Sequence, residues 1–352
     1  MAKRNASGKA KAGVREFPVC GLHISTGHRG DLDLWEKFIR EALPKEGVNT
    51  FVMEINYGYD FKSWPAVAEQ GALTKEEVKR LLGACRDAGV ELIPQVNCLG
   101  HQSWAGHSHG LLRAFPEFDE RLDIPQDADS KALYCRSYCP AHPKVHDVLF
   151  ALLDEVADAF EARQFHIGMD EVFLIAEEKC PRCRGKSAAE LFAGEVTALH
   201  DHLARRGLTT WMWGDRFINS AEFPTGIWEG SGNNTWGAVD RVPTDIVVCD
   251  WHYERAFDTP QFFAAKGFPV LASPWNKPEA ALAELEIMRK LRKKSDKALG
   301  MLQTTWCGFD SFVHAYYGDL PADNKRNEHA LGAAECFKTL FAALRGETKE
   351  AP

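Results

Sequence analysis

The strongest constraint on the fold is an alternation between short apolar runs and longer amphipathic segments along nearly the whole chain. The short runs have the apolar, β-branched character of buried parallel strands, and they cover residues 17–24, 48–55, 90–96, 165–169, 209–213, 246–250, 268–272 and 299–304. Apolar residues recur with helical spacing in residues 32–43, 74–89, 145–162, 188–206, 259–266, 278–294 and 328–344. Eight strands that alternate with helices predict either a closed (β/α)8 barrel or a doubly wound open sheet.

The placement of polar and aromatic residues favours the barrel. They recur soon after the predicted strands, at Glu54, His101, Asp170, Glu171, Asp215, Trp251, Tyr253, Trp275 and Trp306. The carboxyl ends of all strands meet at one mouth in a barrel, whereas an open sheet gathers them mainly at its switch point. No glycine-rich phosphate fingerprint follows the first strand. We therefore expect a single catalytic α/β domain, a (β/α)8 TIM barrel with loop insertions over residues 17–347, preceded by a disordered tail of residues 1–16.

Composition and charge exclude several classes of partner. With 42 basic and 50 acidic residues the formal charge is −8, and the basic residues form no stripe, so no nucleic acid partner is expected. No run reaches the roughly 18 apolar residues that a membrane span requires. The first residues contain no apolar signal-peptide core, so we expect a cytoplasmic protein. A homodimer is compatible with the sequence.

Residues 165–172 are the stretch around which the predicted site is organised. A short apolar run reaches Gly168, whose lack of a side chain allows close backbone approach, and Asp170 and Glu171 then stand side by side. One interpretation is that Asp170 caps the next helix and Glu171 is a solvated residue of its first turn. Because adjacent carboxylates repel each other at the end of a buried strand, the pair favours a chemical role.

The side chains predicted at the barrel mouth suit a carbohydrate. Sugars combine flat C–H faces with a rim of hydroxyl groups, which aromatic rings and carboxylates complement. Five tryptophans lie near predicted strand ends or in the loops after them, namely Trp213, Trp228, Trp251, Trp275 and Trp306. Glycosidases commonly place two carboxylates on opposite sides of the sugar, but Asp170 and Glu171 are neighbours. Their spacing instead suits substrate-assisted cleavage, in which one carboxylate protonates the leaving oxygen and the other orients a nucleophilic acetamido group of the substrate.

These residues resemble a known family. The stretch His166-Ile167-Gly168-Met169-Asp170-Glu171 resembles the H-x-G-x-D-E signature of glycoside hydrolase family 20, the β-N-acetylhexosaminidases. Further matching stretches follow in the expected order, at residues 93–95, 99–101, 213–215, 251–253 and 305–306. With Phe309-Asp310 after them, the pattern is most similar to the intracellular hexosaminidase D branch. The resemblance covers about residues 17–310.

The resemblance implies an activity and a role for the acidic pair. The expected reaction is exo-acting, retaining removal of terminal N-acetylglucosamine or N-acetylgalactosamine through an oxazolinium-type intermediate. Glu171 would be the general acid and base, and Asp170 would orient and polarise the 2-acetamido group. An N-acetylhexosamine-containing glycoside is the expected partner, and no cofactor is required.

The resemblance also implies a set of sugar-binding residues. Tyr253 would contact the acetamido carbonyl, Trp306 would form the pocket floor, Asp215 would meet sugar hydroxyls, His101 would support the acidic pair, and Trp251, Trp275 and Glu54 would complete the site. Many family members carry an arginine after the first strand that grips sugar hydroxyls, whereas residues 23–29 here read His-Ile-Ser-Thr-Gly-His-Arg. We expect that Arg29 is displaced from that role and that His23 or another group fills it.

Two other functions fit the same residues. A catalytically silent carbohydrate-binding barrel would keep the pocket without turnover, although a binding module needs no acid pair. A glycosidase with a standard carboxylate nucleophile would need a further carboxylate at another strand end. Glu229 and Glu54 are the candidates for that carboxylate.

Ten cysteines in a reducing compartment are expected to be mostly free thiols. Two pairs are different, because Cys180 and Cys183 form a tight C-x2-C turn after the predicted catalytic loop and Cys135 and Cys139 lie one predicted helix upstream. Four thiolates could hold a structural zinc ion, with His142 as a substitute ligand. Free thiols and disulfides stay open as alternatives, because nothing in the sequence shows that the two pairs meet.

Overall fold

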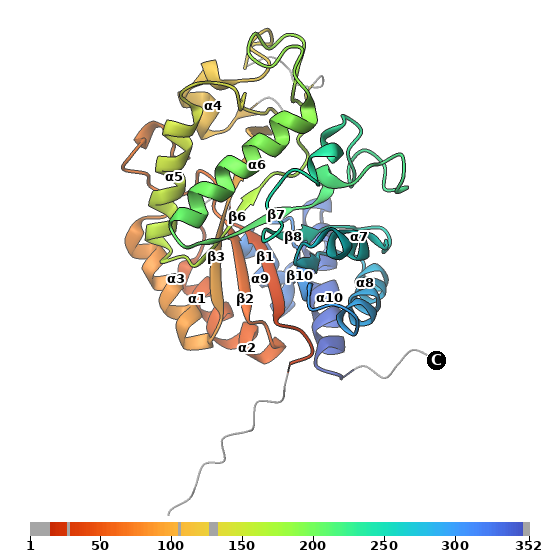
Figure 1. Cartoon of the computed structure of the whole chain (residues 1–352). Helices are drawn as coiled ribbons and strands as arrows, with labels where there is room; N and C mark the ends of the chain where they lie inside the picture. Colours follow the sequence, from red (N-terminus) through yellow and green to blue (C-terminus); the bar gives the residue numbers. More distant parts are fainter. Residues whose placement is uncertain (1–14, 27–28, 105–106, 127–132, 348–352) are drawn as a thin grey trace, which may run out of the picture.

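A closed barrel of parallel strands forms the centre of the molecule (Figure 1). The computed structural model describes residues 15–26, 29–104, 107–126 and 133–347. The barrel strands are β1 (Val19–Ser25), β2 (Thr50–Glu54), β3 (Glu91–Cys98), β6 (Gln164–Gly168), β7 (Thr209–Trp213), β8 (Val247–Asp250), β9 (Val270–Ala272) and β10 (Ala298–Gln303). β1 pairs with β2 on one side and with β10 on the other. This closure confirms the predicted TIM barrel and excludes the doubly wound sheet.

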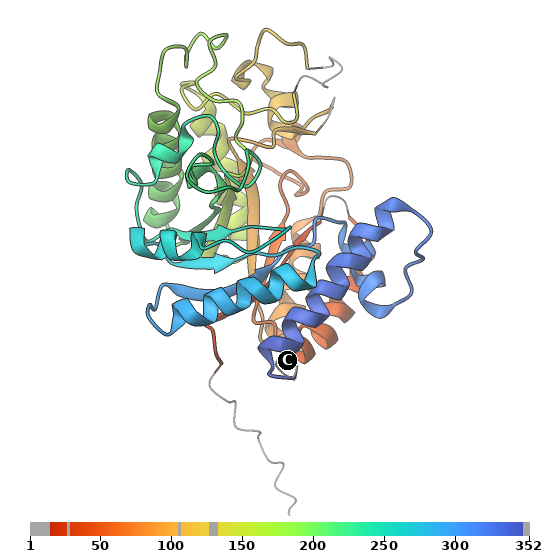
Figure 2. The same ribbon diagram turned by 90° about the vertical axis from the view of Figure 1, so that its right-hand side faces the viewer.

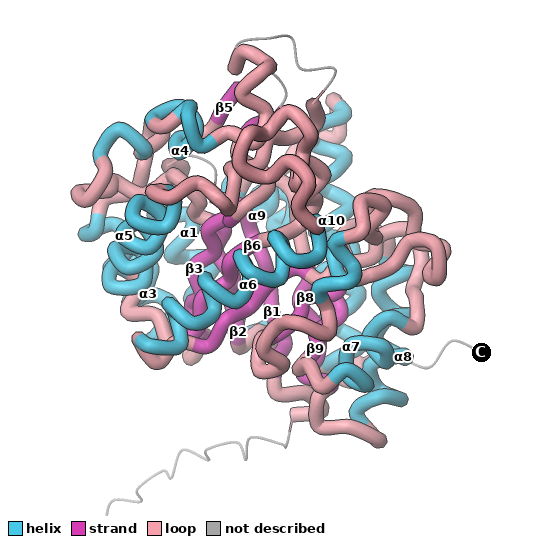
Figure 3. Tube along the Cα trace, turned by 45° about the horizontal axis from the view of Figure 1, so that its top comes forward, coloured by secondary structure: helices cyan, strands magenta, loops and turns pink. Residues whose placement is uncertain are grey.

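Helices surround the strands on the outside of the barrel, and loops cover its upper end (Figure 3). They are α1 (Leu32–Lys37), α2 (Leu43–Glu46), α3 (Lys75–Ala88), α4 (Gly110–Ala114), α5 (Val145–Ala159), α6 (Ala188–Arg205), α7 (Thr259–Lys266), α8 (Pro278–Arg292), α9 (Phe309–Tyr317) and α10 (Lys325–Leu344). Each predicted strand lies within two residues of its expected limits. The strand predictions succeed because strands buried on both faces read as continuous apolar runs.

The structure departs from the predicted elements at four places. A π-helical turn, η1 (Phe38–Ala42), joins α1 to α2 where one α-helix was expected. α4 and α9 were not predicted, and β4 (Ser103–Trp104) pairs with β5 (His107–Ser108) in the loop after β3. Between β7 and β8, where the sequence predicted no helix, the described chain forms only two 3-10 turns, η5 (Asp215–Phe217) and η6 (Thr235–Ala238), and otherwise irregular loop. This long loop lies at the same end of the barrel as the acidic pair.

The apolar core has two parts, one inside the barrel and one outside it. The inner cluster contains side chains from seven of the eight strands and from the residue after β8, namely Val19, Val52, Ile93, Trp211, Trp213, Val247, Cys249, Trp251, Leu271 and Leu302. The larger outer cluster lies between the strands and the helices. α8 and α10 pack against each other on the outside of the barrel (Figure 2). The barrel interior is therefore a packed core, and a functional site can form only at the carboxyl ends of the strands, where the loops lie.

Local signals in the sequence account for the limits of α3. The Thr74 hydroxyl accepts a hydrogen bond from the Glu77 amide, and the Glu77 carboxylate accepts one from the Thr74 amide, which forms the predicted capping box. Gly89 ends the helix in the left-handed conformation with φ 67°. Both predicted ends of this helix are confirmed.

The predicted tail of residues 1–16 lies almost wholly outside the described residues. Glu16, at its end, is bound to Arg289 of α8, with its carboxylate 2.9 Å from Nε. Among the described helices, none combines the length and the apolar character needed to cross a bilayer.

Barrel closure requires a glycine at residue 300. Gly300 pairs with Val19 of β1 and has φ +138°, and a Cβ there would lie 2.0 Å from the Val19 carbonyl oxygen. We predict that Gly300→Ala lowers the free energy of unfolding by about 1–3 kcal/mol or more, because the added methyl group overpacks the β1–β10 seam. Urea unfolding followed by far-ultraviolet circular dichroism measures this change.

Gly83→Ala is the matched control for that substitution. Gly83 lies inside α3, and a Cβ there meets nothing within 4 Å. Alanine should stabilise this helix by about 0.5–1 kcal/mol. Equal effects of the two substitutions would contradict the packing argument at the seam.

Candidate active site

Strained backbone gathers at the carboxyl ends of the barrel strands. Of the described non-glycine residues with positive φ, those that lie just after β2, β3, β6 and β10 are Asn56, Leu99, His101, Met169, Glu171 and Trp306. Such conformations cost roughly 1–3 kcal/mol each and persist where surrounding structure imposes them. The fold therefore holds the predicted site residues in backbone conformations that they would rarely adopt alone.

Gly168 allows β6 to approach β3 closely at the point where the acidic pair begins. Its φ is +69°, and a Cβ there would lie 2.5 Å from Asn97 Oδ1 and 2.8 Å from Asn97 Cα. This contact confirms the close backbone approach predicted for Gly168. It places Asp170 and Glu171 beside the loop that carries His101.

The acidic pair meets on one imidazole. His101 Nε2 lies 3.2 Å from Asp170 Oδ2 and 3.2 Å from Glu171 Oε2, and these three atoms lie within 4.8 Å of one another. Asp170 is buried, whereas Glu171 and His101 are partly exposed. Burial would lower the pKa of His101, but the Asp170 charge and contacts with both carboxylates raise that pKa well above its usual range. A cationic imidazole between two carboxylates offsets their mutual repulsion.

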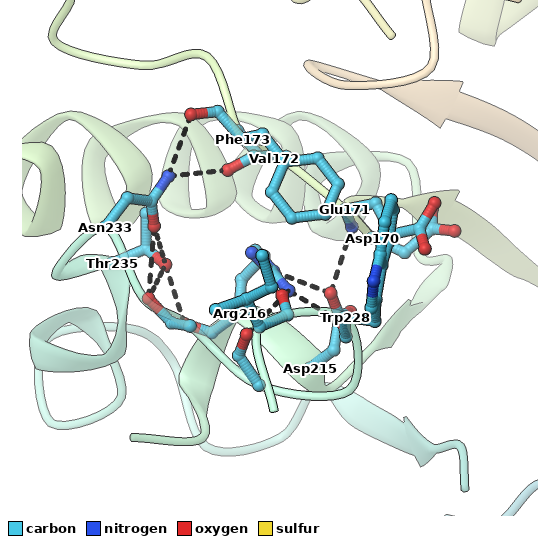
Figure 4. Close-up of polar contacts among 12 residues, drawn as sticks. Asp170, Glu171, Val172, Phe173, Asp215, Arg216, Trp228, Asn233 and Thr235 are labelled. Atoms are coloured by element: carbon cyan, nitrogen blue, oxygen red, sulfur yellow. Dashed lines mark hydrogen bonds and ion pairs between the residues drawn. The ribbon is translucent and has the colours of Figure 1, made fainter. Parts of the chain in front are cut away.

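Asp215 fixes the backbone of Glu171 through a second contact. Asp215, just after β7, accepts a hydrogen bond from the Glu171 amide at 2.9 Å and pairs with Arg216 Nε at 2.6 Å (Figure 4). Its other oxygen accepts from Trp251 Nε1 at 3.3 Å. Burial and the Asp170 charge raise the pKa of Asp215 to about 6, against the opposing effect of Arg216. Asp215 is 1% exposed, so the predicted contact with sugar hydroxyls would require the groups that cover its carboxylate to move.

Arg216 links the acidic pair to the long loop after β7. Its Nη2 donates to the carbonyl oxygens of Ile227, Trp228 and Gly230 at 2.8–2.9 Å, and its guanidinium lies 4.9 Å from the centre of the Phe173 ring. The side chain is 1% exposed. One buried cation therefore orders the β7–β8 loop and contacts the loop that follows Glu171 (Figure 4).

Asn233 joins the same two loops a second time. Its Nδ2 donates to the carbonyl oxygens of Val172 and Phe173 at 2.8 and 3.1 Å. Thr235 donates to the Arg216 carbonyl oxygen at 2.9 Å (Figure 4). The two residues directly after Glu171 are thus held through their backbone.

Three of the predicted aromatic residues form one stacked group at the mouth. Trp251 stacks on Tyr253 with ring centres 4.8 Å apart, and Tyr253 meets Trp275 edge-on at 5.4 Å. Trp306 Nε1 donates a hydrogen bond to the Tyr253 hydroxyl. The Trp306 ring lies 5.0 Å from His23 and 5.7 Å from Trp213, deep in the barrel. These contacts bring the predicted aromatic residues together.

Glu54 lies at the end of β2 as a buried and bonded carboxylate. Its Oε1 accepts from Asn56 Nδ2 at 2.9 Å and from Asn97 Nδ2 at 2.8 Å. Its Oε2 lies 3.8 Å from His23 Nε2. Burial raises the pKa of Glu54 and lowers the pKa of His23 to about 4. Glu54 therefore stands beside the acidic pair as part of a polar floor.

Arg29 lies away from this floor, in agreement with the predicted displacement. Its guanidinium binds the Glu77 carboxylate at 2.8 Å and is partly exposed next to α3. His23 is fully buried beneath Trp306. His23, the suggested substitute for the arginine, has no exposed surface, and its role in sugar binding stays a prediction.

Glu229, the other candidate for a separate nucleophile, is engaged elsewhere. Its Oε2 lies 2.8 Å from His252 Nδ1, and its Oε1 accepts from the Tyr253 amide at 3.2 Å. His252 also contacts Asp250 and Thr259. These bonds give Glu229 a role in holding the strand end that carries Tyr253.

An aromatic rim borders Glu171 on the solvent side. It consists of Trp104, Tyr134, Phe173 and Trp228, with Tyr134 in contact with the other three rings at 4.9–6.0 Å between centres. Burial and the nearby Glu171 charge raise the pKa of Tyr134. Trp104 and Trp228 are 55% and 47% exposed. Exposed rings joined in one patch beside an acid are suited to bind an apolar face.

The structure corrects the predicted cysteine cluster. Cys139, Cys180 and Cys183 come together with Glu120, and these four donor atoms lie within 4.8 Å of one another. Cys135 is not part of this group, because its thiol points at the Glu171 carbonyl oxygen at 3.5 Å. The spacing Cys135-x3-Cys139 suggested a pair, but the chain between them runs past the active site before it reaches the other thiols.

Two groups of described residues have the donor atoms for a metal ion. One is the cysteine group, and the other is His101 with Asp170 and Glu171. In the second group, His101 Nε2 already pairs with both carboxylates at 3.2 Å. Its contacts are explained by ion pairing alone.

Several residues of the site were not predicted from the sequence. Arg216 follows a strand-end aspartate, which is a weak local indication of a buried pair. Asn233, Tyr134 and Glu120 lie in irregular loops, where neither spacing nor hydrophobic period predicts a contact. Only the closed barrel brings these segments to the same strand end.

Comparisons with known proteins agree with this geometry. The sequence model of the glycosyl hydrolase family 20 catalytic domain matches residues 49–307. A beta-hexosaminidase of Akkermansia muciniphila is 28% identical over 162 residues, which are 42% of this chain and 30% of that protein. Hexosaminidase D of Bos taurus is 26% identical over 196 residues, 53% of this chain and 49% of that protein. The matches span less than half the length of both relatives.

A solved structure shares the fold. The beta-N-acetylhexosaminidase from Bacteroides fragilis superposes with a TM-score of 0.62 at 17% identity, over 91% of this chain and 66% of that chain. At this identity the likeness concerns the fold alone.

The buried pair between Asp215 and Arg216 generates a stability prediction. Arg216→Met should lower the free energy of unfolding by about 3–5 kcal/mol, because it leaves the Asp215 carboxylate buried without its partner. Urea unfolding measures the change. Arg241→Met is the control, since Arg241 pairs with Glu190 at 3.3 Å in a half-exposed position, where such pairs contribute under about 1 kcal/mol. Equal losses in the two variants would contradict the role assigned to Arg216.

Proposed function

Because the chain belongs to glycosyl hydrolase family 20, whose catalytic-domain model matches residues 49–307, we propose that it is an exo-acting, retaining β-N-acetylhexosaminidase. The observation that carries the proposal is the geometry of Asp170 and Glu171. Both carboxylates contact one nitrogen of His101 at 3.2 Å and come from the same strand end. They therefore approach a bound sugar from one side, which leaves no opposed pair of acid and nucleophile.

The nucleophile is then supplied by the substrate. The other strand-end carboxylates support this assignment, because Glu54, Asp215 and Glu229 are each committed to hydrogen bonds within the protein. Glu171 donates a proton to the glycosidic oxygen while the acetamido carbonyl oxygen of the sugar attacks C1. The bond from C1 to the aglycone breaks, the aglycone leaves as an alcohol, and an oxazolinium ring forms. Glu171 next removes a proton from water, which adds to C1 and reopens that ring with net retention.

Asp170 and Tyr253 position the acetamido group in this mechanism. Asp170 accepts a hydrogen bond from the acetamido N–H and stabilises the positive charge that develops on the ring. The Tyr253 hydroxyl accepts the Trp306 N–H, so its own proton is free to be donated to the acetamido carbonyl oxygen. His101 holds both carboxylates in place, and the chemistry requires no cofactor.

Substitution of the acidic pair tests the mechanism. Glu171→Gln should lower kcat/KM about 10²–10⁴-fold on N-acetylglucosaminides with poor leaving groups, because proton donation is lost. Its effect should be much smaller with a dinitrophenyl leaving group, which departs without a proton. Asp170→Asn should impair both substrates. Initial rates with the paired substrates measure these losses, and Asp240→Asn, a surface carboxylate bound to Lys266, is the control.

The choice of glycone separates the mechanism from its alternatives. The wild-type protein should cleave aryl β-glycosides of N-acetylglucosamine or N-acetylgalactosamine and leave the matching glucoside intact. Cleavage of the glucoside, or covalent labelling by a 2-deoxy-2-fluoro glycoside, would identify a carboxylate nucleophile of the protein. A folded protein that binds N-acetylglucosamine but cleaves none of these substrates would be the silent barrel.

The aromatic rim makes a separate prediction about the aglycone. Trp228→Ala should raise KM about 5–100-fold for aryl or disaccharide substrates and leave KM for a methyl glycoside nearly unchanged, because stacking on one ring is worth about 1–3 kcal/mol. Trp236→Ala, which removes a similarly exposed ring outside the rim, is the control. Equal changes in KM for the aryl and methyl glycosides would place the aglycone elsewhere.

A further inference from the structure

A buried group of three thiols and one carboxylate lies beside the candidate active site and takes no part in the proposed chemistry. Cys139 Sγ is 3.1 Å from Cys183 Sγ and 3.5 Å from Cys180 Sγ. The Glu120 side chain completes the group, with all four donor atoms within 4.8 Å of one another. All four residues are buried. Three sulfurs converge on one point, whereas a disulfide joins only two.

Glu120 places a buried carboxylate oxygen, without a hydrogen-bond partner within the described ranges, beside the three sulfurs. Its Oε1 accepts a hydrogen bond from the Glu177 amide at 3.0 Å, but its Oε2 has no hydrogen-bond partner among the described residues. No ion pair of Glu120 is found in the described part of the chain. Burial of a carboxylate without a cation is costly, and its free oxygen lies beside the three sulfurs. A bound cation would satisfy the carboxylate and the sulfurs together.

The backbone that carries Cys180 and Cys183 forms a tight hydrogen-bonded turn. In the Cys180-Pro181-Arg182-Cys183 turn, the Cys180 amide donates to the Glu177 carbonyl oxygen at 2.9 Å, and the Lys186 amide donates to the Cys183 carbonyl oxygen at 2.9 Å. The Arg184 amide donates to the Cys180 carbonyl oxygen at 3.0 Å. This short segment therefore brings the side chains of Cys180 and Cys183 to the same side of the chain, next to Cys139.

We propose that this group is a structural zinc site, in which Zn²⁺ is bound by Sγ of Cys139, Cys180 and Cys183 and by Oε2 of Glu120. Four ligands of this kind suit tetrahedral zinc, for which Zn–S bonds of about 2.3 Å place sulfurs about 3.8 Å apart. The Cys139–Cys180 and Cys139–Cys183 separations of 3.5 and 3.1 Å would have to widen by about 0.3 and 0.7 Å to reach this spacing. The three thiols release three protons on binding, and the carboxylate and thiolates leave the site with a formal charge of −2.

The zinc ion would clamp together the two loops that flank the acidic pair. Cys180 and Cys183 lie in the loop between Glu171 and α6, whereas Glu120 and Cys139 lie in the loop between β3 and α5, and both loops rise above the barrel (Figure 1). These same loops supply Phe173 and Tyr134 to the aromatic rim. The ion would thus hold the rim in place from behind without contact with the substrate.

Metal analysis of the purified full-length chain tests the proposal. We expect one zinc ion per chain by mass spectrometry of the metal content, and release of that zinc by about three equivalents of a thiol-specific reagent. Cobalt in place of zinc should give the visible bands of a tetrahedral site and a sulfur-to-cobalt charge-transfer band. Removal of zinc by a chelator should lower Tm, and added zinc should restore it.

Single substitutions identify the ligands. Cys180→Ser and Glu120→Gln should lower the zinc content or weaken zinc binding at least tenfold in competition with a chelator. Cys135→Ser and His142→Gln are the controls, because Cys135 contacts the Glu171 carbonyl oxygen and His142 packs on Phe118. Both controls should keep one zinc ion.

Several results would overturn the proposal. A purified wild-type chain with reduced thiols and no zinc, even after incubation with zinc, would exclude the site. A disulfide between Cys139 and Cys183 in protein prepared under reducing conditions would exclude it as well, and iron in place of zinc would overturn the choice of metal. Loss of zinc from His142→Gln but not from Glu120→Gln would contradict the assignment of Glu120 as the fourth ligand. If the cysteine variants fail to fold, the release of zinc from the wild-type chain by the thiol reagent still tests whether the thiols bind zinc.

Discussion

The contact between one partly exposed imidazole and two adjacent carboxylates is the interaction on which the rest of the site depends. Neighbouring acids at the end of a buried strand repel each other, and His101 offsets this repulsion through Nε2 at 3.2 Å from both. The arrangement also turns both acids toward the same side. Much of the surrounding structure, from Gly168 against Asn97 to Asp215 beneath the Glu171 amide, keeps that geometry in place.

The supports of the acidic pair form two layers with different physical character. Beneath it, polar groups and aromatic rings fill the barrel mouth, and their rigidity follows from burial, close packing and bonds such as those of Glu54 and Asp215. Above it, irregular loops are held by a few side chains with many bonds each, such as Arg216 and Asn233. The strained backbone lies at the junction of the layers, where each strand must turn into a loop.

The sequence predicts the lower layer well and the upper layer poorly. The strands and the acidic pair are visible because buried parallel strands read as apolar runs and because polar residues stand directly at their ends. The aromatic group follows from the same rule. Arg216, Asn233, Tyr134 and Glu120 act through contacts between loops that are distant in sequence, and no local period predicts them. The cysteine spacing misled for this reason, since Cys135 faces the active site and Glu120, 19 residues before Cys139, occupies the fourth position.

The β7–β8 segment replaces a barrel helix with a loop that is anchored by a few side chains, among them Arg216, Asn233 and Thr235. A helix at this position would have to pack against the barrel along its length, so that changes in its sequence would disturb the core. A loop held at a few points is free of that requirement between them. Its outer residues, Trp228 among them, can change in length and chemistry while the barrel stays the same. The fold thus separates the part of the site that performs the reaction from the part that can be remodelled for different partners of the sugar.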